Sequence, residues 1–288
     1  MKFWQSLQFA RTEDLVGLAT AIESQTPFDG VFLGDHTLHP EQCLTPYPYT
    51  PDGKMLWAAD MHWPDIAAAF AAMATATRRL RFVTSVMILP VRHPIDVAKS
   101  MATVSVLSGN RVALGAGLGW MEDEYRAAAI DFHTRGKRCD EMIDVMRLLW
   151  SGSMVEYHGQ HFDFPRSQLS PKPAGTIPIY VGGDSPAAMR RAARRGDGWI
   201  TSGLSRDTLP ENIASVRRML REAGRANEPF EFVASVPPDL DLIRRLEDVG
   251  ANSIFNLATA EEIRGEDTAE LKLDRVRRYG DEIIARFR

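Results

Sequence analysis

The stretch PIYVGGDSPAAMRRAARRGDGWI, residues 178–200, contains one complete strand–helix–strand unit. The β-branched and aromatic run Ile177 to Val181 predicts a strand, and Gly198 to Thr201 predicts the next one. Between them, Pro186 to Arg195 has helical spacing of its apolar residues. Pro186 falls in the first helical turn, where a missing amide hydrogen is tolerated. A strand, a helix and a second strand in this order indicate an α/β fold.

The same alternation continues along the whole chain, with short strand-like runs followed by longer amphipathic segments. The predicted strands are Lys2 to Phe9, Gly30 to Leu33, Leu80 to Ile88, Arg111 to Gly115, Ile177 to Val181, Gly198 to Thr201, Phe230 to Val236 and Ser253 to Leu257. The predicted helices are Glu13 to Ser24, Pro64 to Ala76, Pro94 to Leu107, Cys139 to Trp150, Pro186 to Arg195, Leu209 to Ala223, Leu240 to Val249 and Thr268 to Phe287. Eight strands separated by helices predict a (β/α)8 TIM barrel. Because no Gly/Ser linker divides the sequence, we expect one domain over residues 1–288.

Three stretches interrupt this rhythm. Residues 34–63 form a long segment rich in Pro, Tyr and Thr, and Trp120 to Arg138 adds an acidic turn before the next helix. Val155 to Phe164 predicts a β-hairpin, and a Pro-rich run follows it. We interpret residues 34–63 and 151–177 as insertions into the barrel, where loops at the strand exits tend to carry function.

Composition excludes several classes of partner. The formal net charge of −4 and the pI near 6.0 give no broad attraction for nucleic acid or anionic lipid. Cys43 and Cys139 lie far apart without CxxC spacing, so neither a disulfide framework nor a zinc ribbon is predicted. The first residues lack the pattern of a secretory signal, and no apolar stretch approaches the roughly 20 residues of a membrane span. We therefore expect a cytoplasmic protein that acts on a small molecule.

A polar pair follows the second predicted strand in Phe28-Asp29-Gly30-Val31-Phe32-Leu33-Gly34-Asp35-His36. His36 at the barrel mouth could hydrogen-bond a bound ring or move a proton near neutral pH, with Asp35 fixing the orientation of the imidazole. The alternative is a loop Asx-turn with a solvated histidine. His39 raises a metal site as another alternative. We disfavour a metal site because the remaining histidines do not recur at the ends of strands four to eight.

Glycines mark two other strand ends. Gly115-Ala116-Gly117-Leu118-Gly119 would let a planar ligand or a phosphate approach the backbone, although a plain turn explains it equally well. The spacing does not match a Rossmann fingerprint. Gly182-Gly183, followed by Ser185 and a Pro-initiated helix, indicates a cradle of backbone amides for an anion, and the alternative is an ordinary tight turn. Thr201-Ser202-Gly203 would add hydroxyls from the next strand exit.

The basic run Thr134 to Glu141 is interpreted as structural, with Arg135 or Arg138 holding the second insertion against the barrel rim.

Taken together, the sequence resembles the bacterial-luciferase-like superfamily, and within it the branch of oxidoreductases that use the deazaflavin coenzyme F420. The resemblance is carried by FDGVFLGDH (28–36), LRFVTSVMILPVRHP (80–94), GNRVALGAGLGWMEDEY (109–125), EYHGQHFDF (156–164) and PIYVGGDSPAAMRRAARRGDGWI (178–200). It implies a (β/α)8 barrel with insertions, often a homodimer, and a cofactor lying across the strand ends.

The resemblance also implies positions for site residues. A non-proline cis peptide would fall at Ser85-Val86 and buttress the deazaflavin ring. Asp35 and His36 would lie beside the ring, and Gly117 and Asp123 near its polar edge. The residues implied around the phosphate are Gly182, Gly183, Thr201, Ser202 and Gly203.

Two positions depart from the best-known members of the branch. In relatives that oxidise a sugar phosphate, an acid follows the glycine that corresponds to Gly119, whereas this chain has Trp120. A different substrate is therefore predicted. Leu204 stands where those relatives have a phosphate-binding lysine, so Arg206 or backbone amides would have to neutralise the phosphate.

The leading hypothesis is hydride transfer between C5 of the reduced deazaflavin and a small, fairly apolar organic substrate, with His36 managing the proton. Aromatic residues of the loops would wall the substrate pocket: Tyr47, Tyr49, Trp57, Trp63 and Trp120. An FMN-dependent monooxygenase is the first alternative. A barrel that binds a ligand without catalysis is the second, and a metal-dependent hydrolase is the last.

Overall fold

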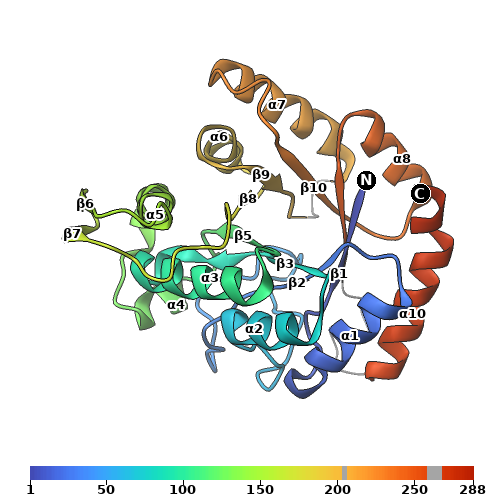
Figure 1. Ribbon diagram of the computed structural model, residues 1–288. Helices are drawn as coiled ribbons and strands as arrows, with labels where there is room; N and C mark the ends of the chain where they lie inside the picture. Colours follow the sequence, from blue (N-terminus) through green and yellow to red (C-terminus); the bar gives the residue numbers. More distant parts are fainter. Residues whose placement is uncertain (203–205, 258–267) are drawn as a thin grey trace.

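A computed structural model describes residues 1–202, 206–257 and 268–288 (Figure 1). Its main sheet contains the parallel strands β1 (Lys2–Ser6), β2 (Gly30–Leu33), β3 (Arg81–Thr84), β4 (Met87–Ile88), β5 (Val112–Gly117), β8 (Ile179–Gly182), β9 (Gly198–Ile200), β10 (Glu231–Val236) and β11 (Ser253–Asn256). The strand order is β3-β2-β1-β11-β10-β9-β8-β5, and pairing of β3 with β5 closes the circle. Strands β3 and β4 both pair with β5, one after the other along its length, so together they count as one strand of the barrel. The barrel therefore has eight strands. The predicted (β/α)8 fold is confirmed.

Helices surround the strands (Figure 1). They are α1 (Leu15–Gln25), α2 (Ile66–Ala76), α3 (Pro94–Ser108), α4 (Glu122–Ala127), α5 (Arg135–Trp150), α6 (Pro186–Arg195), α7 (Leu209–Glu222), α8 (Leu240–Asp248) and α10 (Ala269–Glu282), with a 3-10 turn at Ile284–Arg286. Helix α2 begins two residues later than predicted, because the Asp65 carboxylate accepts the Ala68 amide and caps the helix there. Pro64 therefore precedes the cap, whereas Pro186 occupies the first helical position as predicted.

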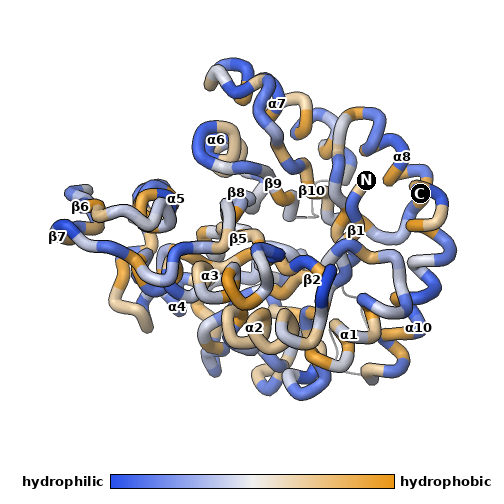
Figure 2. Tube along the Cα trace, in the orientation of Figure 1, coloured by the Kyte–Doolittle hydropathy of each residue, from blue (hydrophilic) through white to orange (hydrophobic). Residues whose placement is uncertain are grey.

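Alternation along the strands divides the core into two layers. One face of each strand packs against the helices, whose apolar and polar residues alternate along α7 and α8 in Figure 2. The other face fills the barrel interior with Trp4, Phe32, Val83, Ala113, Tyr180, Ile200, Val233 and Phe255. Phe32 and Phe255 stack there with ring centroids 4.2 Å apart. A filled interior leaves the strand exits as the place for a ligand.

The predicted strand Leu80 to Ile88 is divided between β3 and β4. The peptide bond between Ser85 and Val86 is cis, at the position that the family resemblance implies. The first strand is shorter than predicted and ends at Ser6, because the chain turns there and Phe9 adopts a left-handed φ of 66°.

The second insertion contains the predicted hairpin, with β6 (Val155–His158) antiparallel to β7 (Asp163–Ser167). Two side chains of α5 hold it. The Glu141 carboxylate accepts the amides of Gln160 and His161 at 3.0 and 2.9 Å, and the Arg138 guanidinium lies 4.8 Å from the Phe162 ring centroid. Arg138, as predicted, joins this insertion to the rim, whereas Arg135 stacks on its neighbour Phe132.

Within the described residues, the helices are too short or too polar to cross a lipid bilayer.

Candidate active site at the barrel mouth

The strand exits bring Asp35 and His36 to the mouth of the barrel, because they directly follow β2. Leu33, the last residue of β2, accepts the Ser85 amide at 2.7 Å. The polar pair therefore lies next to the cis peptide between β3 and β4. This proximity arises from parallel pairing of neighbouring strands, whose carboxyl ends meet at one edge.

Asp35 binds the segment that follows the cis peptide. Its buried carboxylate accepts the Ile88 amide at 2.8 Å and pairs with both terminal nitrogens of Arg92 at 2.7 and 2.9 Å. Arg92 also donates to the Ile88 carbonyl at 2.9 Å. Burial raises the pKa of the Asp35 carboxyl, and the Arg92 charge and the Ile88 amide oppose that rise. The expectation that Asp35 orients His36 is wrong, because these bonds hold Asp35 against β4 and Arg92.

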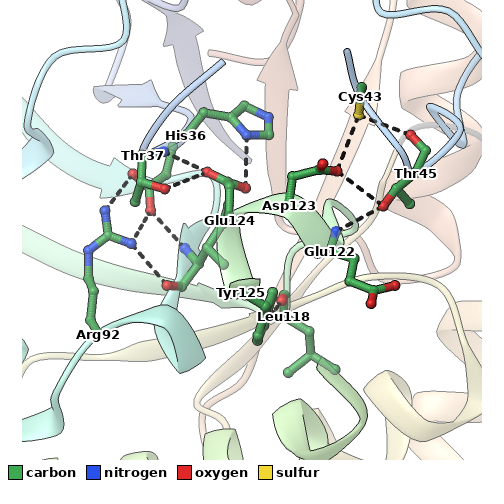
Figure 3. A network of polar contacts seen from close by, with 12 residues as sticks. His36, Thr37, Cys43, Thr45, Arg92, Leu118, Glu122, Asp123, Glu124 and Tyr125 are labelled. Carbon is green, nitrogen blue, oxygen red and sulfur yellow. Dashed lines mark hydrogen bonds and ion pairs between the residues drawn. The ribbon is translucent and has the colours of Figure 1, made fainter. Parts of the chain in front are cut away.

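The residue that binds the His36 imidazole is Glu124, from α4. Its Oε2 lies 3.2 Å from His36 Nδ1, and its Oε1 accepts the Thr37 amide at 2.6 Å and the Thr37 hydroxyl at 2.9 Å (Figure 3). The Glu124 side chain has no solvent exposure, and that of His36 is 10% exposed. Burial works to raise the pKa of Glu124, but the bonds from His36 and Thr37 outweigh it and hold the pKa below its ordinary value. Glu124 is therefore ionised at neutral pH.

Sequence reasoning missed Glu124 and chose its neighbour Asp123. The sequence did contain a sign of an acidic site residue here, because the run Glu122-Asp123-Glu124 comes soon after a glycine-rich strand exit. Successive helical residues point about 100° apart, so only one of the three acids can face the mouth. Which one does so depends on how α4 is placed, and Tyr125 fixes that placement by donating its hydroxyl to the Leu118 carbonyl.

Asp123 lies on the other side of α4 and binds the first insertion (Figure 3). Its carboxylate is 3.4 Å from the Leu44 amide, 3.5 Å from the Thr45 hydroxyl and 3.7 Å from Cys43 Sγ. The Glu122 amide donates to the same Thr45 hydroxyl at 3.0 Å. These contacts attach the insertion to α4, and the implied contact of Asp123 with a cofactor stays a prediction.

The five aromatic residues predicted to wall a pocket form one connected cluster, and its three tryptophans pack against His36. The ring centroids of Trp63, Trp57 and Trp120 lie 4.7, 5.2 and 6.0 Å from the imidazole. Tyr47 packs 5.2 Å from Trp57 and 5.2 Å from Trp120, and Tyr49 packs 5.1 Å from Tyr47. We call these five rings the aromatic wall. Phe9, which the sequence did not single out, joins it 5.4 Å from Trp63.

Val86, the second residue of the cis peptide, lies against two of the predicted glycines. A Cβ on Gly117 would lie 2.2 Å from Val86 Cγ2, and a Cβ on Gly182 would lie 2.6 Å from Val86 Cγ1. Both distances are far below van der Waals contact, so these positions require glycine while Val86 occupies this place. Ser85, Val86, Gly117 and Gly182 therefore meet at one point of the mouth, which we call the glycine shelf.

The predicted phosphate cradle lies at the exits of β8 and β9. Gly183 has a φ of 110°, and the Ser185 side chain caps α6 by accepting the Ala188 amide. The Asp184 carboxylate accepts the Ser202 amide at 3.1 Å and the Ser202 hydroxyl, which joins the two exits. The Thr201 hydroxyl accepts the Ser235 amide of β10 at 2.9 Å.

The roles of these cradle residues toward a phosphate stay predictions. Gly203 and Leu204 lie outside the described residues, as does the Arg206 side chain. Among the residues that the structure describes, His, Cys, Asp and Glu side chains form no group of three or more that could hold a metal ion.

Comparison with known proteins now gives the family. Residues 5–241 match the luciferase-like monooxygenase family. The chain belongs to this family. A solved monooxygenase from Streptomyces bottropensis superposes with a TM-score of 0.82 over all of both chains at 19% identity, which agrees with the fold described above.

Two curated relatives come from Mycobacterium tuberculosis. One, an uncharacterised protein, is 36% identical over 275 residues, which are 94% of each chain. The other is an F420-dependent glucose-6-phosphate dehydrogenase, 31% identical over 246 residues, which cover 82% of this chain and 68% of the relative. The protein is therefore an oxidoreductase of the luciferase-like family.

Proposed function

We propose that the protein is an F420-dependent oxidoreductase that transfers a hydride between C5 of the deazaflavin and a small, fairly apolar organic substrate. The observation that carries the proposal is the His36–Glu124 pair, with Nδ1 and Oε2 3.2 Å apart, beside the glycine shelf and within the aromatic wall. The F420-dependent dehydrogenase from Mycobacterium tuberculosis supports the choice of cofactor.

We propose that the mouth of the barrel would hold the planar ring of the cofactor. At the glycine shelf two backbones without Cβ atoms lie against Val86, next to the Asp35–Arg92 pair and His36. We propose that Ser85, Val86 and Gly117 would hold the ring. Gly182, Gly183, Thr201, Ser202 and Gly203 would hold the phosphate end. When bound, the deazaflavin supplies the carbon that gives or accepts the hydride.

The chain's own residues would then bind and orient the substrate and move its proton. His36 would exchange a proton with the substrate through Nε2, because Nδ1 is engaged by Glu124. The aromatic wall would exclude water and favour an apolar substrate. With Trp120 in the wall 6.0 Å from the imidazole, we propose a substrate other than a sugar phosphate.

A cofactor titration tests the proposal. Purified protein is titrated with coenzyme F420 and, separately, with FMN, and binding is followed by the change in cofactor fluorescence. We expect saturable binding of F420 and at least about tenfold weaker binding of FMN, a difference of about 1.4 kcal/mol. The variant His36→Ala should bind F420 as the native protein does but lose turnover. Binding of neither cofactor would contradict the proposal and favour a barrel that binds another ligand.

The second candidate is an FMN-dependent monooxygenase. It is favoured by the similarity to the Streptomyces bottropensis monooxygenase along the entire chain. Tighter binding of FMN than of F420 in the same titration would favour it. Oxygen consumption that depends on substrate and on reduced FMN would then establish it.

A further inference from the structure

We propose that Glu124 is a positioning residue: it fixes the tautomer of the His36 imidazole, so that Nε2 is the nitrogen that exchanges a proton with the substrate. The inference rests on the proposed function for its kinetic consequence, but the tautomer itself is a property of the protein without cofactor or substrate.

Both oxygens of the Glu124 carboxylate accept hydrogen bonds. An ionised carboxylate only accepts, and each oxygen of Glu124 has a donor: His36 Nδ1 at Oε2, and the amide and hydroxyl of Thr37 at Oε1. If the neutral imidazole carried its proton on Nε2, the lone pair of His36 Nδ1 would face a lone pair of Glu124 Oε2 at 3.2 Å in a buried site. That arrangement is costly, so Nδ1 carries the proton and Nε2 keeps the lone pair.

Contacts on several sides hold this arrangement in place. Glu124 binds two consecutive residues of the first insertion, so both the imidazole and the backbone that carries it are held. Helix α4 is itself fixed to the exit of β5, because the buried Tyr125 donates its hydroxyl to the Leu118 carbonyl. The Trp63 ring lies at 90° to the imidazole with the two centroids 4.7 Å apart. A proton acceptor held on both sides keeps its geometry during a reaction.

Glu124 also faces the positive charge that would develop on His36 during the reaction. When a hydroxyl-bearing substrate is oxidised, the C–H bond breaks and its electron pair leaves with the hydrogen as hydride to the cofactor. The O–H bond breaks as its proton goes to Nε2, and a C=O bond forms. His36 becomes an imidazolium whose Nδ1–H faces the Glu124 carboxylate, which stabilises the new positive charge in a buried site. In the reverse direction the imidazolium returns the proton from Nε2.

The test compares Glu124→Gln with Glu124→Asp and with the matched control Thr37→Val. The glutamine can offer its NH2 group to Nδ1 and thereby favour the other tautomer, whereas aspartate keeps the charge at shorter reach. Thr37→Val removes a hydroxyl bond to the same carboxylate oxygen but leaves His36 Nδ1 its acceptor. Nitrogen NMR of protein labelled in its histidines reports the tautomer directly, and the spectrum of His36→Ala assigns the His36 signals.

We expect the native protein and Thr37→Val to show the proton on Nδ1, and Glu124→Gln to show a shift toward Nε2. In turnover, Glu124→Gln should lower kcat by about 100-fold with little change in KM, and Glu124→Asp should restore part of it. An unchanged tautomer in folded Glu124→Gln would overturn the inference. If Glu124→Gln failed to fold, Glu124→Ala would remove the same acceptor of Nδ1, and an unchanged His36 tautomer in that variant would overturn the inference equally. Loss of the proposed function shows itself differently, as His36→Ala with undiminished kcat.

Discussion

Replacing Gly117 with alanine tests the close packing of the glycine shelf. The new Cβ would lie 2.2 Å from Val86 Cγ2, about 1.3 Å closer than the shortest favourable carbon–carbon contact. The change should therefore force Val86 and the neighbouring backbone apart.

Overpacking of this kind costs about 1–3 kcal/mol of unfolding free energy. In a chain of this size, each kcal/mol lowers Tm by about 2–4 °C. Val86→Ala removes both Cγ atoms and should relieve most of the clash, since the nearest neighbours of the new Cβ would then be the Val86 Cβ at 3.1 Å and the Met87 carbonyl oxygen at 3.6 Å. The double variant should therefore be more stable than the sum of the two single effects by about 1–3 kcal/mol.

Urea unfolding followed by circular dichroism measures the four free energies of this cycle. Gly17→Ala is the matched control, because Gly17 lies in α1 with open space around its Cβ position, and alanine there should add up to about 1 kcal/mol. A Gly117→Ala protein as stable as the native one, or additive effects in the double variant, would refute the packing argument.

Three other variants test the contacts of the mouth and of the second insertion. Arg92→Met should cost about 3–5 kcal/mol at pH 7, because it leaves the charge of the buried Asp35 carboxylate without its partner. The cost should shrink as the pH is lowered, because the variant keeps the burial that raises the pKa of Asp35 and loses the Arg92 charge that opposes it; urea unfolding at neutral and acid pH measures this. The lowered pKa of Glu124 means that its contribution to stability is present above the unfolded value of 4.5 and is lost as the pH falls through the lower folded value. The stability of Glu124→Gln should accordingly fall less steeply than that of the native protein below about pH 4.5, as measured by urea unfolding at acid pH. Glu141→Ala should leave hairpin amides without their acceptor and speed proteolysis between β6 and β7, whereas the exposed Glu156→Ala should leave the cleavage rate unchanged.

The barrel was predictable because the spacing of apolar residues and the amino-acid composition differ between its strands and its helices. Both differences can be read within a short stretch of sequence. Each predicted strand overlaps an observed one, and the hairpin of the second insertion lies where its glycine turn predicts it. The short helix α4 was not predicted, because its residues were expected to form an acidic turn. Other errors fall at element ends, where a single contact decides. The Asp65 cap moves the start of α2, and the left-handed φ of Phe9 lies beyond the shortened β1.

The candidate site was predictable only in part, for a physical reason. His36 and the glycines follow strands, so the topology of the barrel brings them to the mouth. The partners of Asp35 and His36 lie far along the chain, 57 and 88 residues away, and tertiary packing selects them. In the run Glu122-Asp123-Glu124, no local pattern indicates which acid faces inward, because the Tyr125–Leu118 bond sets the rotation of α4.

The attachment of the first insertion to α4 has a consequence for how such a protein can change its substrate. The residues of the first insertion that hydrogen-bond to α4 lie between His36 and Thr45. Tyr47, Tyr49 and Trp57 of the aromatic wall come later in the same insertion. The residues that hold His36 in place and the rings that would shape a substrate pocket thus lie on successive stretches of one loop. Exchange of residues 46–57 between homologues should reshape the pocket while His36 keeps its place, which makes this stretch the natural point for engineering a new specificity.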